Sequence, residues 1–335
     1  QGKNNVAIGH DALSGNTTAD SNTAVGKSAL EANTTGASNT AVGSGALDAN
    51  TTASENTAFG FDALGANTTG DGNTAIGVKA MDANTVGDRN VAVGSEALGA
   101  MNPSTNADMY NVAVGYQASL AITTGIQNVV VGGLAADALT EGNYNVALGT
   151  GALSTDTLGS LNTAIGHSTL NTQNFSSATD SANTAVGAFA GDKITTGQIN
   201  TAMGYLALSK CTTGSSNVAI GYDTLGELTT VSDNTAVGYA ALQASTSGTG
   251  LAAFGKGALR ANTTGNGNTA VGQNALLSNT TGIDNVALGA NALDSNTTAN
   301  DNVAIGRYAL QAVTTSADNV AVGSSALYNN TGASN

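Results

Sequence analysis

Short apolar segments alternate with polar, turn-forming segments at a fixed spacing along this chain. The recurring unit is a pentapeptide, Asn-Thr/Val-Ala-Val/Ile-Gly, which occurs in nineteen copies between Asn5 and Gly323. Successive copies start 17 positions apart in sixteen intervals and 21 positions apart in the other two. Self-similarity at a fixed period is the sequence signature of a stacked repeat architecture. We number the positions of each repeat as columns, with the asparagine in column 0.

The pentapeptide predicts one short β-strand in every repeat. It is rich in β-branched residues and bounded by turn formers, and a 17-residue unit leaves no room for a useful helix. Column 4 is glycine in every copy, which indicates a positive φ angle or a close backbone approach. The repeat therefore predicts an all-β fold, a parallel β-solenoid of about 19 coils. Each coil should hold one strand, a glycine turn and a second extended stretch.

Residues of one kind recur in the same column, and this recurrence predicts ladders that run from coil to coil. Column 0 is asparagine in every copy except Leu251, and stacked side-chain amides are expected to hydrogen-bond to the neighbouring coils. Column 8 is mostly leucine, and column 12 is threonine in all sixteen 17-residue repeats. The ladder residues singled out are Asn22, Gly26, Leu30, Thr34, Asn39, Gly43, Leu47 and Thr51.

The two longer repeats predict loop insertions near 100–109 and 171–181. The first insertion contains the only proline, Pro103, which is expected outside a hydrogen-bonded ladder. The second contains Phe175. Because loop closure tolerates extra length, both loops should bulge outward without disturbing the stack. We expect residues 1–335 to form a single continuous array, and both ends fall inside a repeat, which suggests a piece of a longer protein.

The two faces of the predicted strand indicate that more than one chain takes part. Columns 1 and 3 lie on one face of the strand and column 2 on the other. All three columns hold alanine, threonine or larger apolar residues, so both faces look buried. A thin roll can bury only one face against its own second half. We therefore expect the other face to meet another chain.

Composition narrows the possible partners. The net charge of −14 disfavours nucleic acid and anionic membranes as partners. Glycine is abundant, with 44 residues, but shows no three-residue period, which excludes collagen. No apolar run is long enough to predict a membrane-spanning helix. The single cysteine, Cys211, excludes an intramolecular disulfide framework.

Three sequence segments carry a family resemblance. Residues 5–9 and 302–306, both Asn-Val-Ala-Ile-Gly, resemble the repeat of trimeric autotransporter adhesin heads of the YadA type. Residues 22–36 are similar to phage tail-fibre repeats, in which Asn-Thr-Ala-Val-Gly is followed by Ala-Leu and Asn-Thr-Thr-Gly. The resemblance implies a left-handed β-roll, a homotrimeric rod of three chains around one axis, and an extracellular adhesive or shaft role. We expect no cofactor.

Candidate chemistry is sparse. His10 and His167 lie nine coils apart, so they cannot share a metal ion or a proton, and Cys211 has no recurring histidine partner. No phosphate-binding loop and no Ser-His-Asp arrangement is visible. Acidic residues gather near the turn before each strand, where weak calcium binding is the alternative to a solvated turn. Recurrent Asn-Thr-Thr sequons are by-products of the repeat. We predict that the chain is not an enzyme and holds no metal ion.

The sequence as a whole predicts an extracellular structural fibre or adhesin shaft, on a virion tail fibre or a bacterial cell surface. Its expected partners are further copies of itself, arranged as a trimer or also head to tail, and a cell-surface glycan or protein receptor. Three alternatives stay open: an ice-binding solenoid built on the column-12 threonines, a self-assembling filament, and a polysaccharide-cleaving enzyme. Candidate surface contacts are Tyr116, Tyr205, Tyr222, Tyr239, Pro103 and Phe175.

Overall fold

A computed structural model describes residues 2–330, and these residues contain strands, turns and no helix. They divide into two compact units. Unit 1 is made of the described residues up to His167 together with Asn174–Asp180, and unit 2 of Ser168–Gln173 and the described residues from Ser181 onward. Nineteen strands of three residues, one in each repeat, confirm the parallel β-solenoid that the period predicts.

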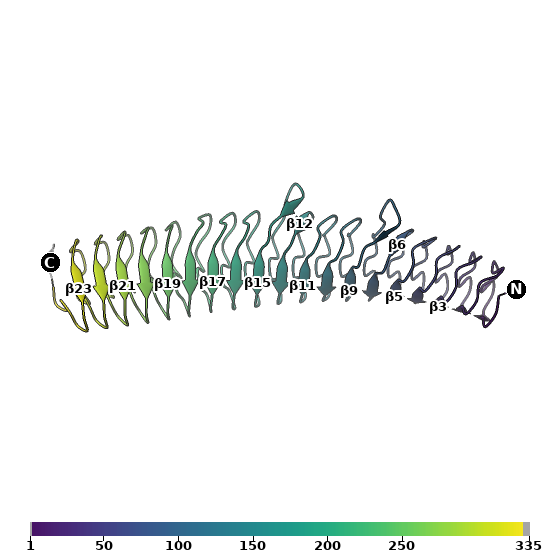
Figure 1. Ribbon diagram of the computed structural model, residues 1–335, viewed down its shortest axis with the longest axis horizontal. Coiled ribbons are helices and arrows are strands. Elements are labelled where there is room, and N and C mark those ends of the chain that lie inside the picture. Colours follow the sequence, from purple (N-terminus) through teal and green to yellow (C-terminus); the bar gives the residue numbers. More distant parts are fainter. Residues whose placement is uncertain (1, 331–335) are drawn as a thin grey trace. The chain divides into compact units, whose positions relative to one another are not determined.

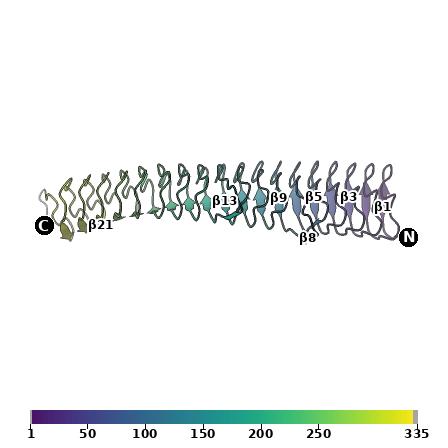
Figure 2. The ribbon, with the colours of Figure 1, turned by 90° about the horizontal axis from the view of Figure 1, so that it is seen from above.

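Ten of these main strands belong to unit 1 and nine to unit 2, and within each unit they lie side by side (Figures 1 and 2). In unit 1 they are β1 (Val6–Ile8), β2 (Thr23–Val25), β3 (Thr40–Val42), β4 (Thr57–Phe59), β5 (Thr74–Ile76), β7 (Val91–Val93), β9 (Val112–Val114), β10 (Val129–Val131), β11 (Val146–Leu148) and β13 (Thr163–Ile165). In unit 2 they are β15 (Thr184–Val186), β16 (Thr201–Met203), β17 (Val218–Ile220), β18 (Thr235–Val237), β19 (Ala252–Phe254), β20 (Thr269–Val271), β21 (Val286–Leu288), β22 (Val303–Ile305) and β23 (Val320–Val322).

Neighbouring main strands pair in parallel, and equivalent residues of successive repeats face each other. Thr23 of β2 pairs with Thr40 of β3, and Thr201 of β16 pairs with Val218 of β17. The register continues across the first insertion, where Val91 pairs with Val112 in spite of the longer repeat between them. The extra residues are therefore accommodated outside the sheet, as the sequence predicts. The trimeric state and the left-handed winding stay predictions.

Small side chains fill the inside of each coil. Away from the first and last coils, alanines of columns 2 and 7, such as Ala41 and Ala46, and leucines of column 8, such as Leu47, are fully buried. Column 2 thus points into the coil, whereas columns 1 and 3 on the same strands are half-buried or exposed. Because the side chains in the core are short, the opposite walls of a coil can lie close together.

The second wall of the coil differs from the extended stretch that the sequence predicts. Its residues in columns 6 and 8 adopt left-handed backbone conformations, with φ of 57° at Ser28 and 51° at Leu30. The wall is still hydrogen-bonded from coil to coil, because the Ser28 N–H donates to the His10 carbonyl at 2.9 Å and the Leu30 N–H to the Ala46 carbonyl at 3.0 Å. A stack of turns therefore forms this wall in columns 6 to 8, and the predicted extended stretch does not include these residues.

Both insertions add short strands that lie away from the row of main strands (Figure 1). In unit 1, β6 (Gly87–Asp88) pairs in parallel with β8 (Ala107–Asp108), and β12 (Gly159–Ser160) pairs with β14 (Thr179–Asp180). Two sequence predictions are wrong here. Pro103 and Phe175 are buried under their loops, so neither is a surface contact. Each insertion folds over the neighbouring coil, so these two apolar side chains pack against the coil and away from solvent.

The column-4 glycines explain why the repeat tolerates no other residue at this turn. Gly132 has a φ of +144°, and a Cβ atom placed there would lie 2.5 Å from the carbonyl oxygen of Gly149. Both facts exclude a side chain, because the backbone conformation favours glycine and the next coil occupies the space. Gly133, the next residue, has open space around its Cβ position.

We predict that Gly132→Ala lowers the thermal midpoint by several degrees, because the strained backbone alone costs about 1–3 kcal/mol and the clash adds to it. Gly133→Ala is the matched control and should leave the midpoint nearly unchanged. Circular dichroism melting of both variants checks this. Equal effects of the two substitutions would contradict the close stacking of column 4.

Candidate functional site

The buried polar groups of the coil form ladders that join successive repeats. In column 0 the Asn39 backbone N–H donates to the Asn22 Oδ1 at 2.9 Å, and the Asn39 Nδ2 donates to the Ala53 carbonyl at 2.8 Å. The same pattern recurs at Asn56 with Gly70 and at Asn217 with Val231. The predicted amide ladder is therefore present. Its main contact runs from a side-chain oxygen to the backbone N–H of the next coil.

Column 11 forms a second buried ladder that changes character along the chain. The Asn50 Nδ2 donates to the Asn33 Oδ1 at 2.8 Å and to the Ala53 carbonyl at 3.1 Å. Elsewhere apolar residues fill the column and are fully buried: Met101, Ile122, Leu139, Ile194, Cys211, Leu228 and Val313. Column 11 faces inward, so its change near the insertions alters the core.

The column-12 threonines are joined to the backbone. The Thr34 Oγ1 donates to the Thr51 carbonyl at 2.9 Å, and the Thr280 Oγ1 donates to the Thr297 carbonyl at 2.9 Å. Because these hydroxyl groups hydrogen-bond to the next coil, they do not form a free array on the surface. The structure gives this ladder a stabilising role and does not favour the ice-binding alternative at this column.

A fourth ladder, in column 15, accounts for some of the acidic residues before the strand. A side-chain oxygen of this column accepts a hydrogen bond from the backbone N–H of the previous coil, as Asp71 Oδ1 does from Ser54 at 2.7 Å. Serine and asparagine fill the same role, since Ser215 Oγ accepts from Gln198 and Asn266 Oδ1 accepts from Thr249. Sequence reasoning missed this ladder because its members differ in residue type and share only an acceptor oxygen.

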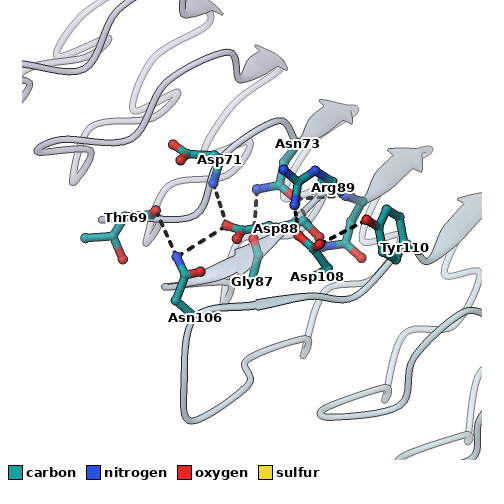
Figure 3. Close-up of polar contacts among 10 residues, drawn as sticks. Thr69, Asp71, Asn73, Gly87, Asp88, Arg89, Asn106, Asp108 and Tyr110 are labelled. Carbon is teal, nitrogen blue, oxygen red and sulfur yellow. Dashed lines mark hydrogen bonds and ion pairs between the residues drawn. The ribbon is translucent and has the colours of Figure 1, made fainter.

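A charged cluster of unit 1 ties the first insertion to the coils before it (Figure 3). Asp88 Oδ1 accepts a hydrogen bond from the Asp71 N–H at 2.7 Å, and Asn106 Nδ2 donates to the Thr69 carbonyl at 3.4 Å. Arg89 forms an ion pair with Asp108, whose Oδ2 accepts a hydrogen bond from the hydroxyl of Tyr110 at 2.9 Å. Burial raises the pKa of Asp88. These contacts join residues of the chain to one another, so the cluster anchors the first insertion.

The candidate catalytic and metal-binding side chains are not brought together. The Nδ1 of His10 lies 2.7 Å from the Oδ2 of its neighbour Asp11, and both side chains are exposed. Cys211 is buried, and burial raises the pKa of its thiol to about 11, so the thiol stays neutral at physiological pH. Within residues 2–330, no group of three or more His, Cys, Asp or Glu side chains is placed to hold a metal ion. The same residues contain no helix able to span a membrane.

Several exposed side chains are large and apolar or aromatic. Outward-facing column 3 contains large exposed side chains, among them Phe59, Met203 and Phe254. The four tyrosines singled out from the sequence are about half exposed, and the structure brings three of them together in unit 2. Tyr205, Tyr222 and Tyr239 stack in successive coils, whereas Tyr116 lies in unit 1.

Neither a scan against protein-family models nor a search of curated proteins finds a match to this chain.

Asp137, in column 9, has one buried carboxylate oxygen whose loss of water is not offset by a hydrogen bond. Its Oδ1 has no hydrogen-bond partner among the described residues, and burial raises the pKa of the group. A carboxyl group whose pKa is raised on folding stabilises the fold when it is protonated, and this contribution is lost as the pH rises through the folded-state pKa.

We predict that Asp137→Asn raises the thermal midpoint at pH 7, because the amide avoids the desolvation of a charge. The advantage should disappear at about pH 3, below the usual pKa of the carboxyl group, where Asp137 is protonated in both the folded and unfolded states. Melting curves of both proteins between pH 3 and pH 7 check the sign of the difference in thermal midpoint. A variant that is less stable at pH 7, or a difference independent of pH, would contradict the assignment.

Proposed function

We propose that this chain is the shaft of an extracellular fibre or adhesin, assembled from three copies that pack their outward strand faces together. The supporting observation is the exposure of column 3, which always holds an apolar residue. Phe59 is 55% exposed in unit 1 and Phe254 is 41% exposed in unit 2. Contiguous exposed apolar surface of this kind is typical of an interaction site.

A second copy of the same chain is the occupant that best fits this face. The outward columns repeat in every coil, so identical chains side by side offer each other the same periodic surface. Columns 1 and 3 contain no charged residue in any repeat, although the chain carries a net charge of −14. Association through this face therefore buries no charge. The number three comes from the resemblance to trimeric adhesin heads.

The assembled fibre would act as a stiff support that carries receptor contacts. The ladders hydrogen-bond side-chain amides, hydroxyls and carboxylates to the neighbouring coil, so these groups stiffen the coils and do not support catalysis. Residues of variable columns at the surface, such as Tyr116 and Tyr205, are available for a receptor glycan or protein. A shaft of this kind gives reach and holds several receptor contacts at once, which raises avidity.

Light scattering of the purified chain tests the assembly. We expect a mass three times the 32.5 kDa of one chain. Phe59→Lys combined with Phe254→Lys should shift the mass toward the monomer, because each substitution places a charge in the interface. A monomeric wild-type chain would contradict the proposal, and masses above three chains would favour end-to-end filaments.

Ile199→Lys is the matched control. Ile199 is 62% exposed, but it belongs to column 16, which accommodates a cation naturally at Arg89. This variant should keep the wild-type mass. If it dissociates the assembly as strongly as the column-3 substitutions do, the outward strand face is not the specific interface.

A further inference from the structure

The stacked tyrosines of unit 2 form a close group of oxidisable side chains on the surface. The ring centroids of Tyr205 and Tyr222 lie 5.7 Å apart with an interplanar angle of 26°. Those of Tyr222 and Tyr239 lie 5.1 Å apart with an angle of 8°. All three belong to column 5, so the parallel register of successive coils places their backbones directly above one another. The stacking of the three rings is therefore a consequence of the repeat register.

The environment of the rings leaves them accessible and free to turn. Each ring is about half exposed, and none of the three hydroxyl groups hydrogen-bonds to another described residue. Lys256 lies in the next coil with its ammonium nitrogen 5.9 Å from the Tyr239 ring centroid. Phe189 packs edge-on against Tyr205, at 6.1 Å between centroids. The stack is therefore bounded by a cation at one end and by a ring that cannot form a phenoxyl radical at the other.

We propose that this column is a site of oxidative dityrosine cross-linking, with Tyr222 and Tyr239 as the preferred pair. A peroxidase with hydrogen peroxide is the oxidant, and it removes one electron and one proton from each phenol. The two phenoxyl radicals couple through their ortho carbons to form one carbon–carbon bond. Each coupled ring then loses its ortho hydrogen as a proton and regains its hydroxyl. Overall the pair loses two electrons and two protons, which reduce one hydrogen peroxide to two waters.

Proximity decides which pair reacts. Two radicals held on neighbouring coils meet within the chain before they meet another molecule, so coupling is effectively unimolecular. The bond requires the rings to slide from a face-to-face to an edge-to-edge arrangement, which unanchored, half-exposed side chains can do. The product joins equivalent positions of successive repeats and fastens one coil to the next. Because the cross-link needs only unit 2 and the oxidant, it does not depend on the proposed assembly.

The remaining tyrosines provide internal comparisons. Tyr308 and Tyr328 meet edge to face at 6.4 Å and 76°, and the Tyr308 hydroxyl accepts a hydrogen bond from Arg307. Tyr116 has Ser95 and Gly133 as its column-5 neighbours, so it has no tyrosine to couple with. Neither position combines parallel stacking with a free hydroxyl group as the Tyr222–Tyr239 pair does.

The test is brief peroxidase oxidation of the full chain at low concentration, followed by dityrosine fluorescence and peptide mass mapping. We expect a cross-link between Tyr222 and Tyr239, with a mass lower by two hydrogen atoms and no covalent joining of chains. Tyr222→Phe should lower the fluorescence several-fold, because it preserves the packing but leaves Tyr205 and Tyr239 two coils apart. Tyr116→Phe is the matched control and should react as the wild type does.

Thermal melting gives a second readout that a surface oxidation without coupling would not change. Oxidised wild-type protein should melt at a higher temperature than untreated protein, whereas oxidised Tyr222→Phe should show no gain. The proposal is overturned if Tyr222→Phe fluoresces as strongly as the wild type, if the cross-links map mainly to other tyrosines, or if they join separate chains.

Discussion

The backbone N–H at the start of each strand needs a hydrogen-bond acceptor, and the column-0 asparagine of the previous coil supplies it. This N–H lies inside the coil, where an unpaired donor costs about 1–3 kcal/mol. The side-chain oxygen of Asn22 accepts from Asn39, and that of Asn39 accepts from Asn56. The same amides donate to the turn before the next strand. One residue type therefore fixes the strand register and the turn in the coils that carry it, which are all except the coil of Leu251.

The alanine core and the glycine turn are consequences of the same close stacking. An asparagine can bridge to the next coil only if equivalent residues lie directly above one another. This arrangement leaves no space for a side chain at Gly43, whose Cβ position would lie 2.1 Å from the Gly60 carbonyl oxygen. The ladder side chains hydrogen-bond to neighbouring coils. The surface therefore presents the apolar outward strand face and the side chains of the variable columns. The proposed assembly depends on the apolar strand face.

The sequence predicts the strands and two of the ladders because these features repeat in residue type. Asn22, Gly26 and Thr34 can be read directly from the 17-residue period. The turn wall cannot be predicted in this way, since Leu30 adopts a left-handed conformation that leucine rarely favours. Column 15 is hidden because Asp71, Ser215 and Asn266 share only an acceptor oxygen. The burial of Pro103 and Phe175 depends on how each loop folds back, which the period does not encode.

Amide hydrogen exchange at single-residue resolution tests the asparagine ladder most directly. The account predicts slow exchange of the column-0 backbone N–H throughout the described coils, for example at Asn56 and Asn217. Asn268 should exchange faster, because the preceding coil has Leu251 in column 0 and offers no side-chain acceptor. Rapid exchange at Asn56 and Asn217, or equal protection at Asn268, would contradict the ladder as the basis of the stack.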